Sequence, residues 1–327
     1  ARSVVELAFA VLVQAAGWAL WSLVRMTHLS RAAPVRSRGR ALSLFGGLIR
    51  AGNVLGPFAF IAIAGSSDVR PAFAIDLVSV VVGVAWVALA RDKHDAAGSG
   101  RSAPIRPLRV VAAHRRSLAV AGTAAFAVSL LRGSRAAIVP LWAAHLGLSS
   151  HGAAALYAFS SLIDLALFYP AGVVSDRFGR RAVLVPSLVL LSIGHLVVPF
   201  TTSFATLFAA AFVLALGNGM GAGIVMTLGA DLTPDEGRPS FLAVWRCISD
   251  AGTTGGPLVD SAVIGLGALA LAGPVVAVLG LAAASLVALR LPEPEHLRNR
   301  RAEAQVVGRR DLATPLELPA EPSGMAD

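Results

Sequence analysis

Apolar residues occur in long runs along this chain, and the short segments between the runs carry most of the charge. A helix that crosses the hydrocarbon core of a bilayer needs about 20 mostly apolar residues. Nine runs reach this length: Val4–Val24, Ala41–Ala64, Pro71–Ala90, Leu118–Leu146, Gly152–Val173, Ala182–Phe200, Phe204–Ala230, Ser240–Gly265 and Leu269–Leu289. The pattern predicts an all-α integral membrane protein with nine transmembrane helices.

The composition supports this interpretation and narrows the chemistry. Of the 327 residues, 56% are hydrophobic and 14% are charged, whereas soluble domains carry about 25% charged residues. The single cysteine, Cys247, excludes an intrachain disulfide and a multi-cysteine metal site. The chain contains no H-E-x-x-H, P-loop or G-x-S-x-G motif, so we expect neither a metal site nor an enzyme.

Basic residues are sorted between alternate connections. One side holds 22 Lys and Arg residues, and the other side holds only Arg2 and Arg70. Because cytoplasmic loops carry the excess of Lys and Arg, the first side is expected in the cytoplasm. The net charge of +9 therefore reflects membrane topology and not a nucleic-acid partner. We expect a multi-pass protein of the plasma (inner) membrane with a cytoplasmic C-terminus.

Part of the chain repeats at an offset of 200 residues. The segment Arg50-Ala-Gly-Asn-Val-Leu-Gly-Pro57 aligns with Asp250-Ala-Gly-Thr-Thr-Gly-Gly-Pro257. The first three runs therefore match the seventh to ninth, and the fourth to sixth have no counterpart. Two six-helix halves, with the first three helices missing, explain which runs match and which have no counterpart. Duplicated halves with a site between them are a common plan of secondary transporters.

The repeat also divides the chain into segments. Residues 1–90 are expected to hold the last three helices of the N-terminal half, 91–117 a cytoplasmic linker, 118–290 the six-helix C-terminal half, and 291–327 a disordered cytoplasmic tail. The chain begins without Met, inside or just before an apolar run. We interpret this beginning as an N-terminal truncation.

The loop expected after the fifth run carries the most specific motif. It reads Gly172-x-x-x-Asp176-Arg177-x-Gly179-Arg180-Arg181. In its spacing and its place on the basic side, this motif resembles motif A of the major facilitator superfamily, in the copy between helices 8 and 9. The resemblance implies a twelve-helix fold of two pseudo-symmetric halves, alternating access and no bound cofactor. It agrees with the repeat, because the fifth run would be the eighth helix of the family.

Motif A is expected to latch the two halves together on the cytoplasmic side. Gly172 would let two helices approach closely. Asp176 would accept hydrogen bonds from free N–H groups at the start of the second helix, near Arg40. The arginines of the motif are also expected to face lipid phosphates.

A second motif is present in part. The second run contains Gly52-x-x-x-Gly56-Pro57, which is similar to motif C, a feature associated with exporters of this family. Its trailing glycines are replaced by Phe60 and Ile61. The alternative is that these residues only allow close packing and a bend.

Three mid-helix amides are candidates for a substrate path: Gln14, Asn53 and Asn218. Gln14 has the spacing of motif B of the family, but Val11 replaces the arginine of that motif, so no proton relay through it is expected. The alternative for all three amides is that they bond helices to one another.

Charged side chains inside the runs need a partner or a purpose, because each costs at least about 2.5–3.5 kcal/mol at mid-bilayer. Six are candidates for proton coupling or buried ion pairs: Arg50, Arg132, Arg135, Asp164, Arg246 and Asp250. At 1.5 Å per residue, Arg135 and Asp164 lie about 17 and 18 Å deep in two helices of a hairpin, near one level. Arg246 and Asp250 are four residues apart and can pair on one helix face.

Asp164 has a second possible partner. Arg50 lies about 15 Å inside its helix, and in the family fold that helix abuts the helix of Asp164. We predict that Asp164 exchanges Arg135 for Arg50 during transport, and that losing a partner favours proton uptake. The alternative is a static salt bridge that only fixes the packing.

The remaining features are interpreted as structural. Asp260 is expected near the outer surface, where water would hydrate it. Trp142, near a helix end, is expected to anchor the protein at the membrane interface. The glycine-rich stretch from Gly217 to Gly223 is expected to form a close-packing face and to let its helix flex.

These observations predict a secondary active transporter of a small molecule. Proton-coupled export of a drug-like or amphipathic solute is favoured by the motif C remnant and by a mostly apolar path. Two other classes stay open, namely a transporter-like sensor or scaffold that moves no solute, and a polytopic membrane enzyme. The expected partners are a small-molecule substrate, the lipid bilayer and protons, and we expect a monomer.

Overall fold

The computed structural model describes residues 38–63, 77–85, 118–221, 223–233 and 238–291, together with the isolated positions 6, 9, 13, 17, 112 and 115. The labelled elements are α2 (Arg38–Ile63), the π-helical turn η1 (Leu118–Gly122), α6 (Thr123–His145), α7 (Ser150–Phe178), α8 (Arg181–Val197), the 3-10 turn η2 (Val198–Phe200), α9 (Phe204–Gly221), α10 (Ile224–Asp231), α11 (Arg238–Gly265) and α12 (Leu269–Arg290). Residues 77–85 are helical as well, and none of the described residues is in a strand. The all-α fold is therefore confirmed for this part of the chain, and the count of nine helices stays a prediction.

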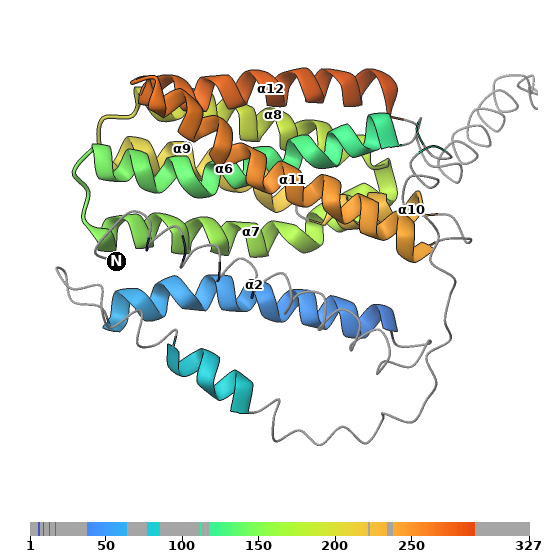
Figure 1. Cartoon of the computed structure of the whole chain (residues 1–327), viewed down its shortest axis with the longest axis horizontal. Helices are drawn as coiled ribbons and strands as arrows, with labels where there is room; N and C mark the ends of the chain where they lie inside the picture. The colour runs from blue at the N-terminus through green and yellow to red at the C-terminus, as the bar shows by residue number, and fades with distance from the viewer. Residues whose placement is uncertain are drawn as a thin grey trace, which may run out of the picture.

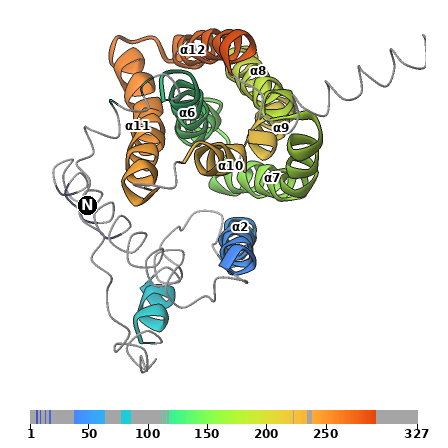
Figure 2. The same cartoon turned by 90° about the vertical axis from the view of Figure 1, so that its right-hand side faces the viewer.

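The helices from α6 to α12 pack into one group (Figure 1). Within it, α6 packs against both α11 and α12, α8 packs against α9 and α12, and α7 packs against α9. Helix α2 lies against α7, on the side of the group away from α12, and both views agree on this placement (Figures 1 and 2). Among the described elements, α7 therefore forms the main contact between the N-terminal segment and the C-terminal group.

Five stretches are long and apolar enough to cross a membrane: Leu118–His145, Ser150–Phe178, Arg181–Phe200, Phe204–Asp231 and Leu269–Arg290. Helix α11 is also long enough, with 28 residues, but its charged side chains make it more polar. A multi-pass membrane protein follows from these spans, because only helices and closed barrels satisfy their own backbone in lipid.

One predicted boundary was wrong. Helix α7 continues to Phe178, five residues beyond the predicted end at Val173. The predicted run Phe204–Ala230 agrees with the apolar stretch Phe204–Asp231, within which α9 ends at Gly221 and α10 begins at Ile224. The junction of α9 and α10 falls at the end of the glycine-rich stretch, where glycine weakens the helix by about 1 kcal/mol per residue.

The internal repeat is visible in two helices. Helices α2 and α11 each contain a proline at the matching position, Pro57 and Pro257. The two segments therefore adopt the same local structure, as the alignment at an offset of 200 residues predicts.

The glycines of α9 form two close-packing faces, which confirms that part of the prediction. A Cβ atom on Gly217 would lie 2.7 Å from the backbone nitrogen of Leu191 in α8. A Cβ atom on Gly219 would lie 2.9 Å from the Cβ of Leu167 in α7. Glycine therefore lets α9 fit between α7 and α8, where any larger residue would force the backbones apart.

A second close approach joins α6 and α11. Added Cβ atoms on Gly252 and Gly256 would collide with the carbonyl oxygens of Phe126 and Leu130 in α6. From the other side, a Cβ atom on Gly133 would collide with the carbonyl oxygen of Thr253. The two helices are therefore in backbone contact along this face.

Other glycines have no close neighbour among the described residues. No described atom lies within 4 Å of a Cβ built on Gly172, on Gly52 or on Gly56. The side chains at the start of α2, the expected neighbour of Gly172, lie outside the described residues, so the close approach at Gly172 stays a prediction. Close packing does not explain Gly52 and Gly56 among the described residues.

Trp142 was also misassigned. Only 5% of the Trp142 surface is exposed, and its indole N–H donates to the backbone carbonyl of Thr201 at 3.3 Å. A position near a helix end predicts an aromatic ring at the membrane interface. In the structure, however, the chain passes over this end of α6 through η2. The ring therefore lies in the protein core and does not anchor the surface.

We predict that Gly256→Ala destabilises the fold while Gly255→Ala does not. The new methyl group at position 256 collides with the α6 backbone, and overpacking of this kind costs about 1–3 kcal/mol. At position 255 the nearest atom would be 3.7 Å away, which is ordinary contact. Thermal unfolding of both variants in the same detergent measures the difference. Equal melting temperatures would contradict the close approach of α6 and α11.

Candidate functional site

A charged cluster lies between three helices. Asp164 is the middle residue of α7, and Arg135 is one residue past the middle of α6. Arg135 Nη1 donates to Asp164 Oδ2 at 3.1 Å, and the exposed fractions of the two side chains are 12% and 16%. The pairing inferred from their shared depth is present, and its role in transport stays a prediction.

Asn218 of α9 completes the cluster. Its side-chain amide donates to the same oxygen, Asp164 Oδ2, at 2.7 Å. The other carboxylate oxygen, Oδ1, is buried and has no hydrogen bond within the described structure. Asn218 thus bonds helices together, as one of its two interpretations predicted, and it does so at the charged pair. Gly219 brings α9 close to α7 at this level, because its added Cβ would lie 3.1 Å from the Cα of Asp164.

Two donors from two other helices converge on one oxygen of Asp164. One is the charged guanidinium of Arg135 and the other is the neutral amide of Asn218. Removing one partner of a buried pair costs about 3–5 kcal/mol, since an uncompensated charge remains. The cluster therefore links α6, α7 and α9 through a single oxygen atom.

The other predicted site residues lie away from this cluster or outside the described part. Gln14 is outside the described residues, and so is the side chain of Arg50, although its backbone belongs to α2, which packs against α7. Asn53 is exposed on α2, and Arg132 is half-buried on α6. The structure therefore leaves the exchange of Arg135 for Arg50 as a prediction.

Arg246 and Asp250 form the pair predicted from their spacing. Arg246 Nε donates to both oxygens of Asp250, at 2.9 and 2.8 Å. More than half of each side chain is exposed, so this pair contributes little to stability beyond the helix itself.

One residue of motif A, Arg180, has three hydrogen-bond partners. Arg180 is largely buried and donates to Ser175 Oγ at 2.6 Å, to Asp176 Oδ1 at 2.6 Å and to Asp231 Oδ2 at 2.8 Å. Asp231 is the last residue of α10, so this arginine ties the α7–α8 connection to the end of α10. Sequence reasoning missed Ser175, which is at a variable position of the motif, and Asp231, which lies outside it.

Burial by itself lowers the pKa of the Arg180 guanidinium, but hydrogen bonds to Asp231 and Asp176 outweigh burial and hold the pKa above its usual value. The side chain therefore stays charged at any pH at which the protein is handled.

Motif A is mostly helix and not loop, which corrects the prediction. Its first part, Gly172 to Phe178, continues α7, and only Gly179 and Arg180 separate α7 from Arg181, the first residue of α8. Gly179 has φ +97°, a conformation that favours glycine, and its N–H donates to the carbonyl of Ser175. Glycine is thus required at this position by the turn itself.

The predicted latch on Asp176 stays a prediction. Its carboxylate bonds to Arg180, and 74% of the side chain is exposed. The Arg177 guanidinium lies 5.4 Å from the ring centre of Phe178. The side chain of Arg40, near the start of α2, is outside the described residues.

Asp260 contradicts its prediction. Only 1% of its surface is exposed, and Ser134 of α6 donates to its Oδ1 at 3.0 Å. Distance along α11 placed Asp260 near the outer end of the helix. The close approach of α6 covers this part of α11, which is why the carboxyl group is buried and not hydrated.

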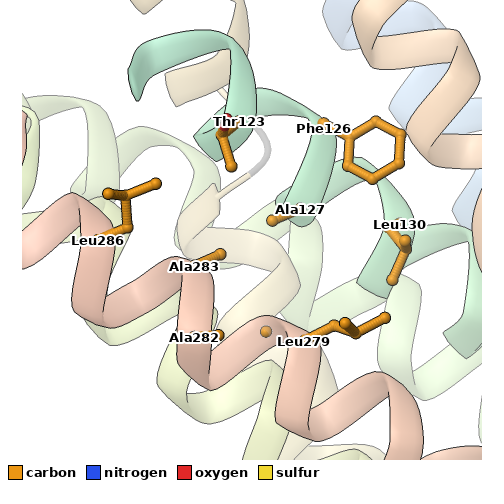
Figure 3. Close-up of a pocket in the computed structure, with 9 residues that line it drawn as sticks. Thr123, Phe126, Ala127, Leu130, Leu279, Ala282, Ala283 and Leu286 are labelled. Atoms are coloured by element: carbon orange, nitrogen blue, oxygen red, sulfur yellow. The ribbon is translucent and has the colours of Figure 1, made fainter. Parts of the chain in front are cut away.

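One groove is apolar and does not include the charged cluster. It has a volume of about 270 Å³ between α6 and α12 and is lined by Thr123, Phe126, Ala127, Leu130, Leu279, Gly280, Ala282, Ala283 and Leu286 (Figure 3). Its one hydroxyl group, on Thr123, donates to Ala119 of the preceding helical turn. The groove therefore offers a polar solute almost no hydrogen bonds, and the charged cluster is the better candidate site.

The described residues contain no group of three or more His, Cys, Asp or Glu side chains that could hold a metal ion.

A bundle of apolar helices with charged side chains paired inside it is typical of membrane transport proteins, in which such residues mark substrate or ion pathways. The profile of the Major Facilitator Superfamily matches residues 121–320, and the chain therefore belongs to this superfamily. The resemblance drawn from motif A is confirmed, and membership indicates a transporter and not an enzyme.

Two proteins that are similar to this chain are named as sugar–proton symporters. Over 93 residues, the chain is 29% identical to the arabinose-proton symporter of Bacillus subtilis (strain 168), an alignment that covers 28% of this chain and 20% of that protein. The crystal structure of a D-xylose-proton symporter matches with a TM-score of 0.53 and 20% identity, over 82% of this chain and 66% of that one. The second match shows a shared fold. In both comparisons the chain spans less than two thirds of its relative.

We predict that Arg180→Gln destabilises the protein and that Arg177→Gln does not. The first change leaves the carboxylates of Asp176 and Asp231 without their shared donor, and hydrogen bonds to charged groups contribute about 1.5–3 kcal/mol. Arg177 is exposed and serves as the matched control. Thermal unfolding in detergent is the measurement. A smaller loss for Arg180→Gln than for Arg177→Gln would contradict the role of Arg180.

Proposed function

We propose that this protein is a secondary active transporter that moves a small solute by alternating access and is coupled to protons. The observation that carries the proposal is the cluster of Arg135, Asp164 and Asn218 between α6, α7 and α9. Ionisable residues at this depth are costly and are found mainly on substrate, ion or proton pathways. Membership of the Major Facilitator Superfamily supports transport as the activity.

The coupling step that we propose is an exchange of partners by Asp164. Helix α2, whose backbone includes Arg50, packs against α7, the helix that carries Asp164. If the two halves move relative to each other, Asp164 gains or loses the guanidinium of Arg50 as well as that of Arg135. A carboxylate that loses a cation in a low-dielectric site becomes a better base, so the movement and proton uptake are linked.

We propose a small neutral solute as the substrate. The names of the two relatives, both pentose–proton symporters, support sugars as the first class to test. Export of an amphipathic solute is the second candidate, and the segment Gly52-x-x-x-Gly56-Pro57, which is similar to motif C, favours it.

We predict that Asp164→Asn abolishes solute-dependent proton movement. The assay follows lumenal pH in everted membrane vesicles from cells that express the protein, while pentoses and then lipophilic drugs are added. Asp250→Asn is the matched control, because it neutralises an exposed carboxylate of a pair on α11.

If proton movement persists in Asp164→Asn, the pair of Arg135 and Asp164 has only a structural role. A response to pentoses supports a sugar transporter, whereas a response to drugs alone supports the exporter. Vesicles that respond to no solute, with the protein folded in the membrane, would contradict transport and favour a sensor or scaffold.

A further inference from the structure

Asp260 is a buried acid that the charged cluster does not use. It lies on α11 with 1% of its surface exposed, and Ser134 on α6 is fully buried beside it. The Ser134 hydroxyl donates to Asp260 Oδ1 at 3.0 Å, and Oδ2 is buried without a hydrogen bond in the described structure. These side chains are covered by protein atoms and not merely by lipid.

The α6–α11 contact keeps water away from Asp260. Gly252, Gly256 and Asp260 follow one another at intervals of four residues and so lie on one face of α11. The two glycines place this face in backbone contact with α6. Asp260 therefore lies one turn beyond a contact that has no room even for a methyl group.

None of the described charged groups on the neighbouring elements forms a hydrogen bond with Asp260. On α6, Arg135 pairs with Asp164, and Arg132 lies two residues before Ser134. On α12, Arg290 is in the last turn, and on α10, Asp231 bonds to Arg180. The only hydrogen bond that the described structure gives to Asp260 comes from the neutral hydroxyl of Ser134.

The two buried acids therefore have different donor sets. Asp164 accepts from a guanidinium and an amide, which suits a carboxylate. Asp260 accepts from one hydroxyl group, and an ionised carboxylate with so little compensation costs several kcal/mol in such a site. The acid form avoids this buried charge: Oδ1 accepts from Ser134 and Oδ2 carries the proton, in an O–H group that has no acceptor among the described residues.

Packing alone does not require an acid at this position. In the internal repeat, Gly252, Gly256 and Pro257 match Gly52, Gly56 and Pro57, and Asp260 matches Phe60. The repeat thus keeps the glycines and the proline and places an apolar ring where α11 has a carboxyl group.

From these observations we infer that Asp260 is a second proton-binding site, which holds a proton while α6 and α11 are in contact and releases it when their separation admits water. The assignment of the proton stands on the geometry, whereas its use in coupling rests on the proposed function. Asp164 and Asp260 would then serve different parts of one cycle.

The first experiment tests the proton alone. Infrared difference spectra of the purified protein in lipid at neutral pH separate the carbonyl stretch of a carboxylic acid from the bands of a carboxylate. We expect the acid band to be present in the wild type and in Asp164→Asn, and to disappear in Asp260→Asn. An acid band that survives Asp260→Asn, or that is absent from the wild type, would overturn the inference.

Ser134→Ala keeps the proposal testable if Asp260→Asn does not fold. This variant removes the hydrogen bond to Oδ1 and leaves the acid in place. We expect the acid band to remain and to shift to higher frequency. A band that does not move would show that it belongs to another residue.

The second experiment tests coupling. In everted vesicles, we expect Asp260→Asn to retain exchange of labelled solute across the membrane and to lose the accompanying proton movement. Unchanged proton movement would overturn the coupling role and leave Asp260 as a neutral structural acid. If even the wild type moves no solute while the acid band is present, the proposed function fails and the proton assignment survives.

Discussion

The lipid interior offers no hydrogen bonds, so every polar group that this chain buries must find its partner within the protein. Backbone groups meet this condition by forming helices. Charged side chains meet it at one place above all, where Asp164 of α7 accepts from Arg135 of α6 and from Asn218 of α9. These three residues lie on three different helices, so the requirement for pairing also fixes how the helices are placed. Removing either Arg135 or Asp164 alone would leave the other charge buried without its partner.

Close backbone approach is the second condition on which the cluster depends. Gly219 allows α9 to come near the Cα of Asp164, and this proximity puts Asn218, the preceding residue, within reach of the carboxylate. Gly252 and Gly256 bring α11 against α6 in the same way, and the result there is the contact between Ser134 and Asp260. In both places, small residues let two helices approach closely, and a nearby polar residue forms a hydrogen bond between them. Membrane helices gain little from hydrophobic association, so such packing and hydrogen bonds carry much of their specificity.

Much of this arrangement could be predicted from the sequence, for physical reasons that differ between features. Run lengths predicted the helices of the described part, because the bilayer sets the length of a span. The equal depths of Arg135 and Asp164 predicted their contact, since two helices joined in a hairpin share one axis direction. Asp260 and Trp142 were misplaced, because burial depends on which helix lies opposite, and position along one helix does not contain that information. The partners of Arg180 were missed for a related reason, as Asp231 is 51 residues away in the chain.

Asp164 and Asp260 are two buried acids with different donors, and the proton inferred for Asp260 follows from that difference. An acid in lipid can be stabilised by donors that match its charge, or it can remain neutral. Arg135 and Asn218 provide the first solution for Asp164, and a single serine leaves only the second for Asp260. The pairing of Asp164 resists change, because a carboxylate that leaves Arg135 also leaves the guanidinium without its partner. The neutral form of Asp260 depends only on the exclusion of water. A small separation of α6 and α11 suffices to hydrate this acid. A helix contact made through glycine is therefore well suited to control a proton, since any movement that opens the contact also hydrates the acid behind it.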